Sequence, residues 1–331
     1  MKRLTAYTTL VTAAIMSGCG GIPVPEGADG FIHVRTDIAS VSESPLSKAE
    51  IDGSNAPSFP LYLCETLHDS FSDTPLNNQT NGIYSTGKKW EGGEYSFHAY
   101  MYSGNGISNI EDKGRSLTIT QPAGAPSADG SNSGFSDYLL SYTYYVGDGD
   151  TRPLVELKMV HATSSVELHF IRPAGASEAR VLGAGISGVR YSATYSVTNH
   201  TDNDIRWYVT PVGDRISYLR STDGQDGGSA FTAPEAGADG SMFPEGSLYF
   251  SFLTCQQPVD NAGSPVTIHV DYEINGSPFS SSFSLDEVQG VGNWMAGTKT
   301  RYAIVLDSEA RLYGSIEPWG DGGEMEGSMI P

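Results

Sequence analysis

One stretch near the end of the chain decides the fold. It reads Trp294-Met-Ala-Gly-Thr-Lys-Thr-Arg-Tyr302-Ala-Ile304-Val-Leu306, and Arg311-Leu-Tyr-Gly-Ser-Ile316-Glu-Pro-Trp319 follows after a short gap. Tyr302, Ile304 and Leu306 recur at every second residue, which is the period of a strand that buries one face. Residues 307–310, Asp-Ser-Glu-Ala, supply a turn, after which the alternation continues to Ile316. The stretch therefore predicts a hairpin that closes a β-sheet.

The composition extends this prediction to the whole chain. The sequence has 331 residues, among them 39 Gly, 18 Pro and 18 Tyr, a mixture that favours many short strands joined by turns. The length suits two domains. A formal net charge of −20 argues against nucleic acid as a partner and against electrostatic binding to anionic membranes. Three Cys are too few for a disulfide scaffold.

The first residues have the features of an export signal. Lys2 and Arg3 precede a modest apolar run at 4–15, and the chain then reads Met16-Ser17-Gly18-Cys19. The run is too short for a transmembrane helix, which needs about 20 apolar residues. A Cys after small residues resembles the bacterial lipobox, so we predict a lipoprotein signal peptide at 1–18 and lipidation (palmitate) of Cys19. The alternative is an ordinary signal peptide with an incidental Cys.

A Gly/Pro-rich tether at 19–30 leads to a first short strand at 31–36. Ile32 and Val34 share one face of this strand, and Phe31, His33 and Arg35 share the other. Further runs predict strands at 90–101, 154–161, 165–170, 179–182, 189–197 and 266–274. The last of these ends at Asn275-Gly276, the strongest short signal for a hairpin.

Three of these segments, in this order, resemble the fimbrillin family, the lipoprotein pilins of Bacteroidetes. They are Trp90 with its glycines and aromatic strand, the Asp137-Tyr138-Leu139 element followed by His161 and Ser165, and the closing hairpin. The resemblance implies an all-β fold of two Greek-key, transthyretin-like β-sandwich domains in tandem. We place these domains at 31–175 and 176–331. One departure is Cys255, which stands near the place where fimbrillins usually carry Pro.

The resemblance also implies a function. It predicts a structural subunit (stalk, anchor or tip) of a fimbrium that supports cell adhesion, exported to the cell outer membrane and exposed on the surface. Its partners would be other fimbrial subunits, the outer membrane through the lipid anchor, and a host or bacterial surface ligand. The resemblance further implies that a protease would remove the first strand and that donor-strand exchange would fill the vacated groove by β-augmentation. Arg35 is our candidate maturation cleavage site, and Lys48 is the alternative.

Two other classes of function compete with the pilin. The main alternative is a monomeric outer-membrane surface lipoprotein that binds glycan or host protein without polymerising. A hydrolase is the third class, but the carboxylates occupy no motif that fixes their separation. Asp148-Gly-Asp150 and the Asp223 loop lack the ligand series of a calcium site, and the dispersed His residues have no zinc spacing. We therefore predict no catalytic residue, no metal and no cofactor.

Three side chains remain to be assigned. His161 could serve catalysis or metal binding, but we expect a half-buried His that hydrogen-bonds across the turn after its strand. Cys64 and Cys255 fall in different predicted domains, so we expect two buried thiols. A disulfide between them is the alternative.

Overall fold

The computed structural model describes residues 30–38, 58–68, 71–76, 79–80, 83–104, 107–124, 134–150, 154–197, 207–221, 231–237, 241–259, 264–288 and 292–318. Cys19 and Lys48 lie outside these residues. Arg35, His161 and both remaining cysteines lie within them.

The prediction of an all-β fold is confirmed. The strands are interrupted by two short 3-10 helices, η2 (Asp112–Gly114) and η3 (Leu285–Glu287). The strands are β1 (Phe31–Ile38), β2 (Leu61–Glu65), β3 (Phe71–Leu76), β4 (Gln79–Thr80), β5 (Ile83–Lys89), β6 (Tyr95–Tyr102), β7 (Asn109–Glu111), β8 (Ser116–Thr120), β9 (Tyr138–Ser141), β10 (Tyr144–Val146), β11 (Val155–His161), β12 (Thr163–Ile171), β13 (Ala179–Ser196), β14 (Tyr208–Ser221), β15 (Phe231–Thr232), β16 (Leu248–Cys255), β17 (Gln257–Pro258), β18 (Thr267–Ile274), β19 (Ser277–Ser284), β20 (Asn293–Trp294), β21 (Thr298–Val305) and β22 (Arg311–Pro318).

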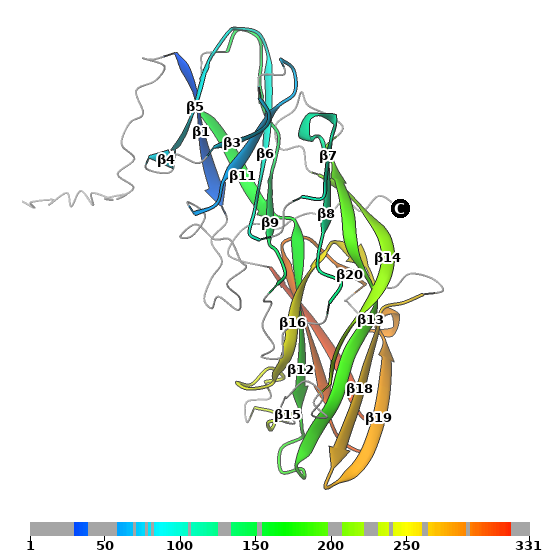
Figure 1. Cartoon of the computed structure of the whole chain (residues 1–331). Helices are drawn as coiled ribbons and strands as arrows, with labels where there is room; N and C mark the ends of the chain where they lie inside the picture. Colours follow the sequence, from blue (N-terminus) through cyan, green and yellow to red (C-terminus); the bar gives the residue numbers. More distant parts are fainter. Residues whose placement is uncertain are drawn as a thin grey trace, which may run out of the picture.

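The N-terminal part is built on one large sheet, drawn from blue to green at the top of Figure 1. Its strand order is β3-β2-β6-β9-β11-β1-β5-β4, and β10 pairs with β6. Tyr95, Phe97, Ala99 and Met101 of β6 point into one core with residues of β1, β2 and β11, as the alternation predicts. The opposite face of β6 is buried as well, because Tyr100 belongs to a second cluster.

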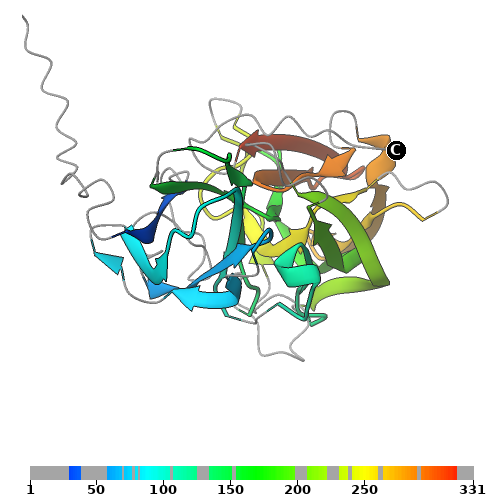
Figure 2. The ribbon, with the colours of Figure 1, turned by 90° about the horizontal axis from the view of Figure 1, so that it is seen from above.

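The C-terminal part consists of two sheets that enclose a core. One has the order β16-β12-β21-β22, and the other has the order β19-β18-β13-β8-β7 with β14 and β15 also paired to β13. Figure 2, seen from above, shows strands of the two sheets on either side of the interior. The core between them is apolar, with Phe252, Ile268, Trp294, Tyr302 and Ile304 fully buried.

The closing hairpin is confirmed as β21 and β22, which pair antiparallel from Thr298↔Pro318 to Val305↔Arg311. The Asn275-Gly276 hairpin is confirmed as β18 and β19. Asn275 and Gly276 have φ of +50° and +76°, the positive pair that a type I′ turn requires.

Two predicted strands, 179–182 and 189–197, are wrong as separate elements. The chain between them, Gly183 to Gly188, continues the same strand, so β13 runs for 18 residues. Its neighbours compensate for the glycines with shifts in register, at 181/183 against β18 and at 187/189 against β14. In Figure 1 this strand runs from the C-terminal sandwich up to β8.

Several strands pair across residue 175. β12, which precedes it, pairs with β16 and β21, and β8 pairs with the C-terminal half of β13. A third apolar cluster, which includes Tyr138, Leu117, Ala193 and Tyr195, lies where these elements meet. The boundary between 175 and 176 therefore stays a prediction, and two tandem transthyretin-like sandwiches stay a proposal.

Candidate functional site

The first strand of the described chain lies inside the N-terminal sheet. β1 pairs parallel with β11, from Val34↔Val155 to Ile38↔Met159. On its other side it pairs antiparallel with β5, from Phe31↔Lys89 to Arg35↔Ile83. The hydroxyl of Thr86 on β5 also donates to the carbonyl of Ile32 at 2.8 Å. β1 therefore joins β11 to β5, and without it each of these two strands would present a free edge.

The side chains of β1 divide between two faces as the alternation predicts. Ile32 and Val34 are 1% and 0% exposed and belong to the N-terminal core, while Ile38 packs against the same core. Phe31 lies half-buried on the other face, with the Lys89 ammonium 5.5 Å from its ring centre. The apolar half of this strand is thus an integral part of the core.

Arg35, the candidate cleavage site, lies in the middle of β1. Its backbone pairs with Ile83 on one side and Glu156 on the other. Its guanidinium forms an ion pair with the Glu156 carboxylate, and each of these two side chains is 51% exposed. An exposed pair of this kind adds little stability. The strand predicted from the sequence ended at residue 36, whereas β1 continues to Ile38.

His161 has a different environment from the one we expected. It is 3% exposed rather than half-buried, and its Nδ1 lies 2.9 Å from Asp137 Oδ2 and 3.1 Å from Oδ1. Thr163 Oγ1 donates to Asp137 Oδ1 at 3.0 Å. The partner is therefore a buried carboxylate 24 residues earlier and not a group across the turn, so the expected hydrogen bond was wrong. The three residues join the segment before β9 to the ends of β11 and β12.

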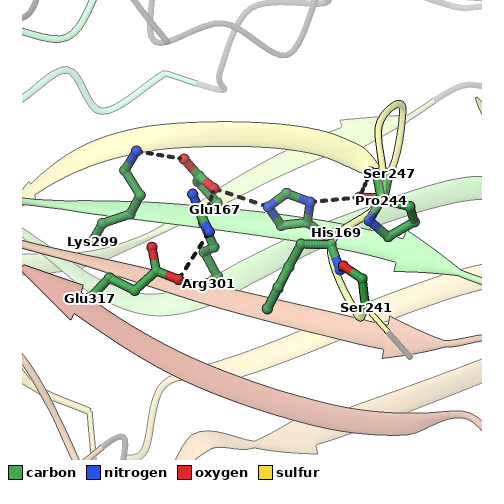
Figure 3. Close-up of polar contacts among 9 residues, drawn as sticks. Glu167, His169, Ser241, Pro244, Ser247, Lys299, Arg301 and Glu317 are labelled. Atoms are coloured by element: carbon green, nitrogen blue, oxygen red, sulfur yellow. Dashed lines mark hydrogen bonds and ion pairs between the residues drawn. The ribbon is translucent and has the colours of Figure 1, made fainter. Parts of the chain in front are cut away.

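A second buried polar group lies on the outer face of the C-terminal sandwich (Figure 3). His169 Nδ1 is 2.9 Å from Ser247 Oγ, and His169 Nε2 is 3.0 Å from Glu167 Oε2. Ser, His and Glu are the residue types of a hydrolase triad. Here Ser247 is fully buried and its hydroxyl donates to the carbonyl of Pro244 at 2.6 Å. A hydroxyl that is buried and committed to a carbonyl is not placed to attack a substrate.

Charge holds this group together. Arg301 Nε lies 3.0 Å from Glu167 Oε2, and Lys299 Nζ lies 3.6 Å from Oε1. Burial alone would raise the pKa of Glu167, but the His169 hydrogen bond and the positive charges of Lys299 and Arg301 outweigh it and hold that pKa below its ordinary value. Arg301 also pairs with Glu317 at 3.0 Å. No local pattern in the sequence indicates this network, because its members become neighbours through the parallel pairing of β12 with β21 and the antiparallel pairing of β21 with β22.

Both described cysteines are buried, and they form no disulfide with one another. Cys64 and Cys255 lie in the same apolar cluster despite their distance in the sequence. Burial raises the pKa of the Cys255 thiol to about 12, so it remains protonated at neutral pH. Two buried thiols were expected, and this is what the structure has.

Of the two motifs compared with calcium loops, Asp148-Gly-Asp150 lies within the described residues and the Asp223 loop lies outside them. Asp150 Oδ2 accepts a hydrogen bond from the backbone N–H of Gly147 at 2.8 Å, as in an ordinary turn. Within the described ranges, no group of three or more His, Cys, Asp or Glu could hold a metal ion. The same part of the chain contains no helix of sufficient length and apolarity to span a bilayer.

Comparisons with known proteins find similarity only at the level of structure. No family model matches the chain, and no curated protein matches it in sequence. A provisionally named cell adhesion protein from Bacteroides uniformis is 13% identical, with a TM-score of 0.45 over 88% of this chain and 99% of that one. One from Parabacteroides distasonis is 10% identical, with a TM-score of 0.48 over 89% and 98%. A fimbrial assembly protein from Parabacteroides distasonis is 8% identical, with a TM-score of 0.38 over 87% and 96%.

Proposed function

We propose that this chain is a structural subunit of a cell-surface fimbrium. It is exported as a lipoprotein precursor and assembled by protease-triggered donor-strand exchange. Its two β-sandwich domains follow the architecture of fimbrillins. The observation that carries the proposal is the place of β1. The first described strand of the chain is paired on both sides in the interior of a sheet, with Ile32 and Val34 fully buried.

Removal of β1 would create a strong acceptor for another strand. β11 and β5 would each lose the partner on one side, and unpaired strand edges bind extended segments readily. The pockets of Ile32 and Val34 would open to solvent at the same time. A donor strand that refills both pockets gains about 3–6 kcal/mol from apolar burial alone, in addition to the backbone pairing. Exchange of such a strand would be slow to reverse.

The position of Arg35 gives the cleavage step a physical requirement. A strand that is paired on both sides has to open locally before a protease can bind its backbone. A cut after Arg35 would release residues 31–35 and leave Thr36–Ile38 paired with Leu157–Met159. A cut after Lys48 would release the whole of β1. We propose Arg35 as the site, with Lys48 as the alternative.

The anchor completes the proposal. Lipidation of Cys19 would hold the precursor at the outer membrane, and residues 19–30 would tether the first strand to it. Cleavage at either basic residue separates the folded chain from this lipid. Assembly and release from the anchor would therefore be one event.

Purified chain with Cys19→Ala provides the test. We expect limited digestion with a trypsin-like protease to yield multimers that survive mild detergent and run as a ladder on a gel. The variant with Arg35→Gln and Lys48→Gln should give no such ladder under the same digestion, and a matched Arg180→Gln variant, altered at an exposed site on β13, should give one. The absence of a ladder from every variant would contradict assembly by strand exchange and would favour a surface lipoprotein that does not polymerise.

A further inference from the structure

β22 is an edge strand with few of the features that block edge pairing. Among the described strands it pairs only with β21. Its eight residues are paired in regular register, without a bulge, and Pro318 stands only at its end. Free edges of this length are normally protected by an inner Pro, a bulge or lysines, because they otherwise bind further strands.

Another long edge of the same sandwich, β14, has features that block edge pairing. β14 pairs only with β13 in the described chain. It contains Pro211 in its interior and Gly213 at a φ of +77°, beside a shift in register between Arg190 and Ser192 of β13. β22 has none of these interruptions.

The inner face of β22 is also left partly uncovered. The register of β21 and β22 places Ile316 directly opposite Thr300. Leu312 and Ile316 therefore point to the same side of the sheet as the buried side chains of Thr300 and Tyr302. Nevertheless Ile316 is 39% exposed. A groove of about 430 Å³ opens between β22 and β19, the edge of the opposite sheet. It is lined by Ser282, Phe283, Ser284, Glu287, Val288, Leu312, Tyr313 and Gly314. The sandwich is therefore open along this side.

We propose that a second copy of this chain covers β22 by antiparallel pairing of the two β22 strands about Gly314. In this register Arg311 of each copy lies opposite Glu317 of the other, so the contact contains two opposite-charge pairs. Leu312 lies opposite Ile316 twice, which joins apolar side chains on the inner face. Cross-strand pairs of both kinds stabilise a sheet, and a contact that uses the same patch twice has the two-fold symmetry of most dimers.

The geometry of the faces agrees with this register. It pairs odd residues with odd and even with even, so the inner faces of both four-stranded sheets lie on the same side. The two grooves then meet, and Ile316 of each copy is removed from solvent. Arg311 and Glu317 contact Asp307 and Arg301 in their own chain, but their side chains are 55% and 47% exposed. Each is therefore accessible to a partner.

Charge reversals can distinguish the proposed Arg311–Glu317 pairs from the general repulsion between two negatively charged chains. Each chain carries a formal charge of −20, which opposes association at low salt. If overall charge governed the dimer, Glu317→Arg would strengthen it and Arg311→Glu would weaken it. The proposed register instead requires both single reversals to weaken it, because each places two like charges opposite one another.

Sedimentation of the full chain with Cys19→Ala, at about 0.15 M salt where charges are screened beyond about 8 Å, tests the register. We expect a concentration-dependent dimer, a dissociation constant raised about tenfold by either reversal, and recovery in the variant with both Arg311→Glu and Glu317→Arg. A chain that is monomeric at all concentrations overturns the proposal. So does a dimer that either reversal leaves unchanged, or that the double variant does not restore.

Cross-linking gives a second, independent measurement. Two Gly314 residues directly opposite in an antiparallel pair have Cα atoms about 4.5–5.5 Å apart, within the range of a disulfide. We expect Gly314→Cys to form a disulfide-linked dimer under mild oxidation. Leu219→Cys, at a 59% exposed site on the protected β14, should not. Equal cross-linking of both variants, or of neither, overturns the register. The chain in these tests retains β1, so their failure leaves the proposed strand exchange unaffected.

Discussion

Replacement of His161 by Ala tests how the N-terminal sheet is joined to the sandwich below it. The ring is 3% exposed, and its Nδ1 lies 2.9 Å from a carboxylate that is itself fully buried. The variant would leave Asp137 in place with the Thr163 hydroxyl at 3.0 Å. It would thus remove the ring without removing the charge that the ring contacts.

The expected loss follows from these contacts. A hydrogen bond to a charged group contributes about 1.5–3 kcal/mol to stability. When one partner is removed and the other stays buried, the protein loses this whole contribution. Truncation of a buried ring adds a cavity, since the surrounding structure relaxes only in part. We therefore predict that His161→Ala lowers the free energy of unfolding by about 3 kcal/mol.

Urea denaturation followed by tryptophan fluorescence measures this loss. His269→Ala is the matched control, because His269 is about half exposed and contacts only Ser282 and Asp271 in the hydrogen bonds described. The control should change stability by no more than about 0.5 kcal/mol. Equal effects of the two variants would refute the structural role of His161. A stoichiometric metal in the native protein, lost with His161, would refute it as well.

Three further predictions concern the lipid anchor at Cys19, the buried carboxylate of Glu167, and the close contact between Gly114 and Cys64. Cys19→Ala should move the protein from the membrane fraction to the soluble fraction and abolish uptake of labelled palmitate. Because the pKa of Glu167 is lowered in the folded state, its contribution to stability is present above the ordinary Glu pKa of about 4.3. That contribution should be lost as pH falls through the folded pKa, so urea titrations of wild type and Glu167→Gln should converge in acid. Gly114→Ala should cost more stability than Gly92→Ala in thermal unfolding. Both sites have positive φ, but only at Gly114 would the new Cβ collide with Cys64.

Local patterns in the sequence predicted local structure well. The alternation of Tyr302 and Ile304, and the Asn275-Gly276 pair, indicated hairpins that the structure contains. The two faces of the first strand were also predicted correctly, because Ile32 and Val34 alternate with larger polar or aromatic residues. In each case the signal lies within about ten residues of chain.

Pairing between distant segments could not be predicted in the same way. The sequence gives no period that would bring Glu167 beside Lys299 or His161 beside Asp137. The glycines between 183 and 188 suggested a break, yet two neighbouring strands hold this segment extended within β13. Nor does the composition of β1 reveal that it lies inside a sheet and not at its edge. These features depend on long-range pairing, which overrides local preference.

N-terminal sequencing of chains taken from purified polymers tests the central claim most directly. Cells that express the protein would be the source, and electron microscopy with label against this chain would identify the polymers. We predict that the sequenced chains begin at Thr36, after a cut that removes most of β1, or at Ala49 if Lys48 is the site. Polymers built from chains that still begin at Cys19 would contradict strand exchange at the position of β1.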